Sequence, residues 1–255
     1  ALDSGIVPDV FFGHAGADFS EYYASGVLKD ITQLIKDNGT YDRIESGYYG
    51  PYTVDGKIYG YPEAVLTPWQ SLYVNRDIFD ACGITEDPTT VDELIATCNT
   101  IRENGYDPIA IGDKDGWPAV ILCGDYYAQQ TADYGELNKI LTGEDTFPGN
   151  EVFRNAFATV VELGQNGAYM SGFSSTDHNT AIQAFAAGQT AMLYCGSWWS
   201  SIAGGTDNGF TLDVIQLPLM EGLTDNVSVQ LCADIALLPT RDASESALGK
   251  FFDYI

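Results

Sequence analysis

Basic residues are scarce in this sequence: 11 Lys and Arg stand against 36 Asp and Glu, which gives a formal net charge of -25. Nucleic acids and anionic membrane surfaces attract proteins through clusters of basic side chains, and the sequence contains no such cluster. We therefore expect no nucleic-acid partner, and a neutral, hydroxyl-rich ligand rather than a phosphate or a carboxylate. Solubility alone also explains the acidic surplus.

Long apolar runs are missing as well. No segment approaches the roughly 20 apolar residues that cross a bilayer. No signal peptide is present at Ala1, and we expect that processing or truncation has removed one.

Cysteine and histidine are too few and too scattered for a zinc site. The two histidines are His14 and His178, and no two cysteines form C-x-x-C. We expect no bound metal and interpret most cysteines as small buried apolar residues. A disulfide between Cys82 and Cys98 stays open as an alternative. The complete set of cysteines is Cys82, Cys98, Cys123, Cys195 and Cys232.

Motifs of catalysis and of cofactor binding do not occur either. The sequence has no G-x-S-x-G nucleophile elbow, no dinucleotide-binding G-x-G-x-x-G and no phosphate-binding G-x-x-x-x-G-K. No histidine follows Ser197 to complete a triad, and neither histidine has a local pattern that would activate a cysteine. We expect binding without turnover and no cofactor. Glycoside hydrolysis by two carboxylates stays open, because 36 acidic residues make chance pairs inevitable.

What is present is an alternation of short strands and helices, which is typical of α/β architecture. Thr90 and Glu93 predict a capping box at the start of a helix, and Asp55-Gly56 predicts a two-residue hairpin turn. Helical spacing of apolar residues predicts a further core-facing helix, marked by Val152, Phe153, Phe157, Val160 and Val161.

The chain is organised around residues 188–199. Residues 190–194 are apolar enough to form an interior strand that follows a helix. Gly196 is expected to turn the backbone, so that Trp198 and Trp199 stand at the C-terminal end of this strand. Ligands of open α/β sheets bind at that end. Because two adjacent rings cannot share a face, we expect at most one indole to point into a ligand cleft.

Two other loops follow predicted strands. Trp117 comes after the short strand 108–112 and before a helix, as Trp198 follows its own strand. His14 and Asp18 lie in a loop of small residues after an earlier strand. That loop is either an edge that contacts ligand or an ordinary turn in which Asp18 or Ser20 caps the next helix.

The motifs in this order resemble the family 1 extracellular solute-binding proteins of sugar ABC importers, the group of the maltodextrin-binding protein. Each motif alone is weak, but together they occur in the family's order with about its spacing and cover most of the chain. The matching segments are PDVFF at 8–12, DGKIYGYP at 55–62, LYVNRDIF at 72–79, PTTVDEL at 88–94, AFAAGQTAM at 184–192 and GSW at 196–198.

The resemblance implies an α/β, two-lobed periplasmic-binding-protein-like fold of type II, incomplete at both ends. Lobe one would hold residues 1–68 and 232–255, and lobe two would hold residues 69–231. Compared with the family, the chain lacks the first strand and helix and a long C-terminal portion. Ligand groups from those parts cannot be assigned in this sequence.

The resemblance also implies which residues contact ligand. Trp198 matches the family's stacking aromatic in lobe two, and Trp117 matches a loop whose residues reach the sugar. In lobe one, the loop from His14 to Asp18 matches a segment that contacts sugar hydroxyls, although it is one residue longer here. The remaining expected contacts lie at or near the crossings between the lobes: Glu63, Trp69, Gln70 and Gln230.

These implications predict extracytoplasmic binding of a neutral carbohydrate, in the first instance an oligosaccharide, for delivery to the permease subunits of an ABC importer. The protein would be a monomer, held at the cell surface as a lipoprotein or free in the periplasm. Sugar suits the residues, because an indole packs on the apolar face of a pyranose and Asp, Glu, Gln and Asn bind its hydroxyls. The alternatives are a binding protein of the same fold for a solute such as a polyamine, and a glycoside hydrolase.

Overall fold

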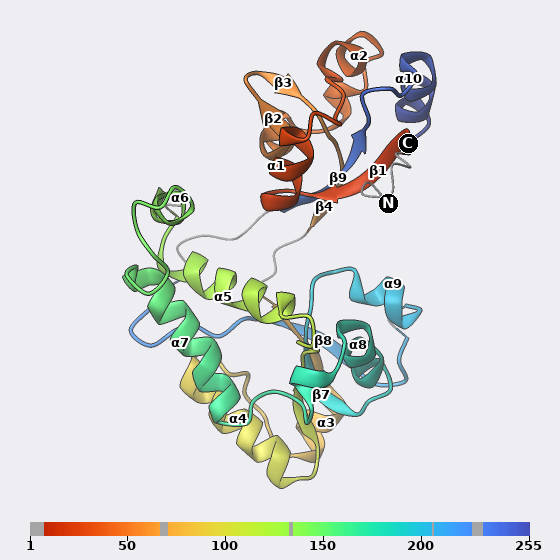
Figure 1. Ribbon diagram of the computed structural model, residues 1–255. Helices are drawn as coiled ribbons and strands as arrows, with labels where there is room; N and C mark the ends of the chain where they lie inside the picture. Colours follow the sequence, from red (N-terminus) through yellow and green to blue (C-terminus); the bar gives the residue numbers. More distant parts are fainter. Residues whose placement is uncertain (1–7, 67–70, 133–134, 206, 226–231) are drawn as a thin grey trace. The chain divides into compact units, whose positions relative to one another are not determined.

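The computed structural model describes residues 8–66, 71–132, 135–205, 207–225 and 232–255. The chain divides into unit 1, made of Ala1–Thr67 with Leu231–Ile255, and unit 2, made of Pro68–Gln230. Each unit has its own sheet and its own apolar core. Segments from both ends of the chain therefore build unit 1, and the middle of the chain builds unit 2 (Figure 1).

The sheet of unit 1 has the strand order β1-β9-β4, with β1 at Val10–His14, β9 at Cys232–Pro239 and β4 at Tyr61–Leu66. β9 is antiparallel to both neighbours, so β1 and β4 run in the same direction. The late strand β9 thus lies between two early strands. This position joins the two ends of the described chain in one sheet.

Helices and turns cover this sheet. A tight hairpin forms at Asp55 and Gly56, which have φ of 50° and 75°, as the sequence predicts. The core includes Ile35, Tyr61 and Phe252, all buried. The elements besides the sheet are α1 (Ala17–Ala24), α2 (Thr32–Asp37), η2 (Tyr41–Arg43), η3 (Ser46–Tyr52), β2 (Thr53–Val54), β3 (Lys57–Ile58) and α10 (Glu245–Tyr254).

The sheet of unit 2 has the strand order β6-β7-β5-β8. β6 is parallel to β7, whereas β5 is antiparallel to both β7 and β8. Every residue of β7 is buried, as predicted for an interior strand. The strands are β5 (Ser71–Asn75), β6 (Asp107–Ala110), β7 (Thr190–Tyr194) and β8 (Leu212–Gln216).

Helices on both faces bury β7. Met192 and Tyr194 belong to the core that α4, α5 and α7 cover, and Leu193 and Cys195 belong to the core under α8 and α9 (Figure 1). This alternation follows from the period of two along a strand. The helices are α3 (Arg76–Ala81), α4 (Val91–Glu103), α5 (Trp117–Gln130), α6 (Gly135–Leu141), α7 (Glu151–Gln165), the short η4 (Phe173–Ser175), α8 (His178–Ala186) and α9 (Trp199–Ala203).

One prediction about α7 is wrong. Phe157 is 63% exposed and Val161 is also exposed, although the spacing placed both in the core. The buried positions of α7 are instead Ala156, Thr159, Val160 and Leu163. α7 packs against α5, and the small Ala156 on the contact face lets the two helices approach. The apolar stripe in the sequence is wider than the face that the helix buries.

The suggested disulfide between Cys82 and Cys98 is also wrong. Both are free thiols, as are Cys123 and Cys195. Burial raises the pKa of the Cys82 thiol, and it also raises that of Cys98, to about 12. These thiols are therefore protonated, which agrees with their role as small apolar side chains.

The described segments contain no helix with the length and apolar character needed to cross a membrane. Within the same segments, no group of His, Cys, Asp and Glu side chains is placed to hold a metal ion.

Candidate functional site

The ends of β6 and β7 bring two predicted ligand-contacting residues into one region of unit 2. The strands are parallel neighbours, with Ile109 opposite Met192. Their C-terminal ends therefore lie at the same edge of the sheet. The segments that follow them carry Trp117 and Trp198. In open α/β sheets this edge is the usual position of a ligand.

The loop after β6 lies against the start of α8. The backbone N–H of Asp113 donates to the carbonyl of Phe173 at 2.9 Å. A Cβ on Gly112 would overlap the backbone carbonyl of Asp177, so only glycine permits this close approach. Asp177 is the N-cap of α8. The first helical residue, His178, is thereby placed beside the loop that leads to Trp117.

Local capping fixes the start of α5 at Trp117. Gly116 is the N-cap, with φ of 79° in the left-handed region, and Pro118 follows Trp117 in the first turn. The Asp113 carboxylate accepts a hydrogen bond from the N–H of Ala119 at 3.0 Å, which satisfies one free donor of the helix. Trp117 stays 38% exposed. The helix start thus presents an indole at the sheet edge.

Trp117, His178 and Trp198 form what we call the aromatic cluster. The rings of Trp117 and His178 have centroids 4.4 Å apart at an interplanar angle of 64°. The rings of His178 and Trp198 have centroids 6.4 Å apart at 50°. Such tilted contacts are favourable for aromatic rings. A buried imidazole therefore lies between one exposed indole and one half-buried indole.

Gly196 turns the backbone as predicted and has a second role. The N–H of Trp199 donates to the Gly196 carbonyl at 3.2 Å, which closes a turn, but the φ of Gly196 is not positive, so the turn itself does not require glycine. A Cβ at this position would instead overlap the six-membered ring of Trp198. The missing side chain gives the Trp198 indole room to lie against the backbone. Trp199 is only 2% exposed and belongs to the core, so of the two adjacent indoles only Trp198 offers accessible area.

The structure also pairs two residues that the sequence did not connect. The Cys195 sulfur lies 3.4 Å from Nε2 of His178. Burial raises the pKa of the Cys195 thiol. Burial also lowers the pKa of His178 to about 4, and the charge of Asp177 opposes this shift only in part. Both groups are neutral near pH 7, whereas a cysteine nucleophile needs a thiolate.

Three predicted ligand contacts lie in unit 1. His14 ends β1, Glu63 lies in β4, and Asp18 is in the first turn of α1; all three are exposed. His14 and Ala64 pair with the same residue of β9, Ile235. His14 and Ala64, the residue after Glu63, therefore stand at the same level on the two strands that flank β9. Gly16, rather than Asp18 or Ser20, is the N-cap of α1, so the capping alternative is wrong.

The other predicted contacts, Trp69, Gln70 and Gln230, lie outside the described residues.

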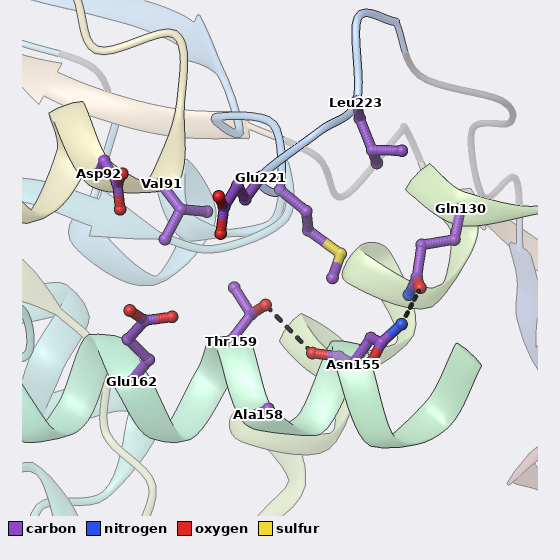
Figure 2. A pocket seen from close by; sticks show the side chains of 10 residues that line it. Val91, Asp92, Gln130, Asn155, Ala158, Thr159, Glu162, Glu221 and Leu223 are labelled. Carbon is purple, nitrogen blue, oxygen red and sulfur yellow. Dashed lines mark hydrogen bonds between the residues drawn. The ribbon is translucent and has the colours of Figure 1, made fainter. Parts of the chain in front are cut away.

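Unit 2 contains a pocket of about 360 Å³ between the start of α4, α7 and the chain after β8. Carboxylates of Asp92, Glu162 and Glu221 line it (Figure 2). On its floor the Thr159 hydroxyl donates to the Asn155 carbonyl at 3.1 Å. None of the predicted ligand contacts lines this pocket, so it is a separate acidic hollow.

Solved structures of two-lobed proteins share this fold. One, from work on xylan utilization by the thermophilic bacterium Caldanaerobius polysaccharolyticus, has a TM-score of 0.85 at 24% identity and covers 98% of this chain and 63% of its own. A chitin oligosaccharide binding protein has a TM-score of 0.83 at 21% identity, over 100% of this chain and 62% of its own. These likenesses confirm the predicted two-lobed fold.

The chain belongs to the bacterial extracellular solute-binding protein family, whose model matches residues 1–252. An uncharacterized ABC transporter extracellular-binding protein of Pyrococcus horikoshii is 26% identical over 99% of this chain and 55% of its own length. A probable sugar-binding periplasmic protein of Rhizobium meliloti is 25% identical over 72% of this chain and 43% of its own length. The chain thus spans about half the length of the curated relatives it matches.

Proposed function

We propose that this protein binds a neutral carbohydrate, in the first instance an oligosaccharide, outside the cytoplasm and delivers it to the permease of an ABC importer. The observation that carries the proposal is the aromatic cluster, with its two indoles at the C-terminal edge of the unit 2 sheet. The ligand would lie in the cleft that this class of protein has between its lobes. Closure of the lobes around it is a hinge motion.

The chemistry of the aromatic cluster suits a sugar. The C–H face of a pyranose is apolar and packs on an indole, whereas its hydroxyl groups need polar partners. We assign the stacking to Trp198 and Trp117. The polar contacts are assigned to His14, Asp18 and Glu63 in unit 1 and to Gln70 and Gln230, and Trp69 is a further expected contact. Relatives and neighbours named for sugars support the same class of ligand.

Delivery to a permease follows from the class of protein. A solute-binding protein whose lobes close on ligand offers its transporter two shapes, and the permease can bind the closed one preferentially. We propose membrane permease subunits as partners and a monomer in solution. Localisation would be at the cell surface, as a lipoprotein, or in the periplasm.

A cationic solute such as a polyamine is the second candidate. The net charge of -25 and the acidic pocket of unit 2 favour it. That pocket shares no residue with the aromatic cluster, and the indoles of the cluster suit a sugar face better than a flexible polyamine. A sugar is therefore the first choice.

Trp198→Ala tests the assignment. Binding of xylo-, chito- and malto-oligosaccharides and of spermidine is measured by calorimetry on the full-length protein. We expect one of the sugar series to bind. Trp198→Ala should weaken that binding about tenfold or more, which corresponds to a loss of ~1.4 kcal/mol or more in binding free energy. The melting temperature should change little, since Trp198 is half-buried.

Phe157→Ala is the matched control, because it removes an exposed aromatic ring elsewhere in unit 2. It should leave the affinity unchanged. Unchanged sugar affinity in Trp198→Ala would reject the stacking role. Spermidine as the only ligand would favour the cationic alternative, and release of reducing ends from the oligosaccharides would favour a hydrolase.

A further inference from the structure

His178 holds a central place in the aromatic cluster, although it is itself only 7% exposed. It is the first residue of α8, whose N-cap Asp177 accepts a hydrogen bond from the N–H of Thr180 at 2.9 Å. Its ring contacts Trp117 closely and Trp198 more loosely. A rigid helix start therefore places one ring against both indoles.

Cys195 connects this ring to the segment that carries Trp198. Its sulfur lies 3.4 Å from Nε2 of His178. Cys195 directly precedes Gly196 and the turn that carries Trp198, and the backbone N–H groups of Gly196 and Trp199 partly oppose the rise that burial causes in the pKa of its thiol. A continuous set of contacts thus runs from the Trp198 segment through Cys195 and His178 to Trp117.

Packing alone does not account for an imidazole at this position. Nδ1 of His178 is buried and has no hydrogen-bond partner among the residues that the structure describes. A buried polar atom without a partner is unfavourable, and buried polar groups are satisfied almost everywhere in proteins. A phenyl ring would fill similar space without this cost. What an imidazole adds is the contact of Nε2 with Cys195, which fixes the rotation of the ring.

We propose that His178 is a positioning residue that, held by Cys195, sets the orientation of Trp117 and Trp198 for the ligand. The proposal rests on the proposed function for the role of the two indoles, but the orientation itself is independent of any ligand. His178 acts through the indoles and does not itself touch the sugar. The imidazole stays neutral near pH 7, because burial lowers the pKa of His178 to about 4 and the neighbouring Asp177 opposes this only in part.

Fluorine NMR of the full-length protein with 5-fluorotryptophan tests the orientation without ligand. The signals of Trp117 and Trp198 are assigned with Trp117→Phe and Trp198→Phe variants. We expect His178→Ala to shift and broaden both signals. His178→Phe should leave the Trp117 signal broadened, because it restores ring volume but not the contact with Cys195. Cys195→Ala should broaden it as well, although Cys195 is not a ring neighbour of Trp117.

Leu94→Ala is the matched control, because it truncates a fully buried residue in a different core of unit 2. It should lower the melting temperature and leave both signals in place. Wild-type signals in His178→Ala would overturn the proposal. So would sharp wild-type signals in His178→Phe, since ring volume alone would then place the indoles. The phenylalanine variant decides the question if His178→Ala does not fold.

A double-mutant cycle connects orientation to binding, with xylotriose, chitotriose and maltotriose as probes. His178→Ala should weaken binding about tenfold in the wild type but less than about twofold in Trp117→Ala/Trp198→Ala, because coupled residues are not additive. Equal losses in both backgrounds would overturn action through the indoles. If no trisaccharide binds the wild type, the proposed function fails for these probes, and the NMR signals still decide the role of His178.

Discussion

The two ends of α5 carry different kinds of side chain. At its start Trp117 is 38% exposed and belongs to the aromatic cluster. In its second half the polar residues Asp125 and Gln129 are fully buried beside the fully buried Tyr126. One helix therefore exposes an apolar ring at the proposed ligand site and buries polar groups that form hydrogen bonds within unit 2. Recognition and anchoring should be separable by mutation.

Gln129 shows what the anchoring end does. Its Nε2 donates to the carbonyls of Pro218 at 3.1 Å and Leu217 at 3.4 Å, and its Oε1 accepts from the N–H of Met220 at 3.1 Å. In this stretch Leu219 is paired with the chain around Thr90, and the Gln129 side chain satisfies three backbone groups on either side of Leu219. The burial of Gln129 is explained by these bonds, because an amide is costly to bury unless it is paired.

Among the variants that test whether the two ends of α5 are separable, Gln129→Ala should have the largest effect on stability. The variant leaves backbone groups of residues 217–220 buried without their partner and opens a cavity, so we expect a loss of about 3 kcal/mol in the free energy of unfolding. Denaturant titration measures it. Sugar affinity, measured at a temperature where the variant is folded, should stay near that of the wild type.

Gln130→Ala is the matched control at the next position. Gln130 is only half-buried and donates to the carbonyls of Tyr126 and Val152. We expect a loss of about 1 kcal/mol or less. A loss equal to that of Gln129→Ala would contradict the assignment of the anchor to Gln129. A fall in affinity as large as that of Trp198→Ala would show that the two ends of α5 are not separable.

Asp125→Asn should produce a smaller effect that depends on pH. Burial raises the pKa of Asp125 to about 7 although the Tyr194 hydroxyl donates to Oδ2 at 2.5 Å. The folded protein thus binds a proton that the unfolded chain has lost, and stability falls as the pH rises from about 4 to about 7. Asparagine cannot ionise. The variant should therefore exceed the wild type by about 2 kcal/mol at pH 8 and resemble it at pH 4.

The measurement is the free energy of unfolding of both proteins across this pH range. Asp213→Asn provides a contrast, because its carboxylate is exposed and bonds with Arg76 lower its pKa. That variant should not gain stability above pH 7. A difference between Asp125→Asn and the wild type that is constant with pH would mean that Asp125 does not titrate in this range.

The local parts of the fold could be predicted because their interactions span few residues. The Thr90 hydroxyl accepts from the N–H of Glu93, and the Glu93 carboxylate accepts from the N–H of Thr90, as the capping box requires. The positions of Trp117 and Trp198 followed from the ends of two strands. The exposure of Phe157 could not be read in this way, because which side of an apolar helix is buried depends on the helix packed against it.

The contact between His178 and Cys195 was missed for a similar reason, since the two residues belong to different elements. One signal was nonetheless available. α8 packs on the sheet and leads through a short loop into β7. Such a helix runs antiparallel to the strand that follows it, so the start of α8 and the end of β7 meet at one edge of the sheet. A buried histidine at such a helix start is therefore a candidate neighbour of whatever follows the strand.

Gly196→Ala is expected to have the smallest effect, and it tests whether this glycine makes room for the Trp198 ring. Replacing a glycine that has a positive φ strains the backbone. Replacing a glycine that makes room for a ring displaces the ring. Because Gly196 does not have a positive φ, Gly196→Ala should fold with near-normal stability and displace the Trp198 indole. We expect sugar affinity to fall about fivefold, a change of less than ~1.4 kcal/mol in binding free energy, together with a shift of the Trp198 fluorine signal.

Gly47→Ala is the control, since a Cβ there meets no atom within 4 Å and its φ is not positive. Loss of stability without loss of affinity would show that Gly196 is needed for the turn and not to make room for the Trp198 ring.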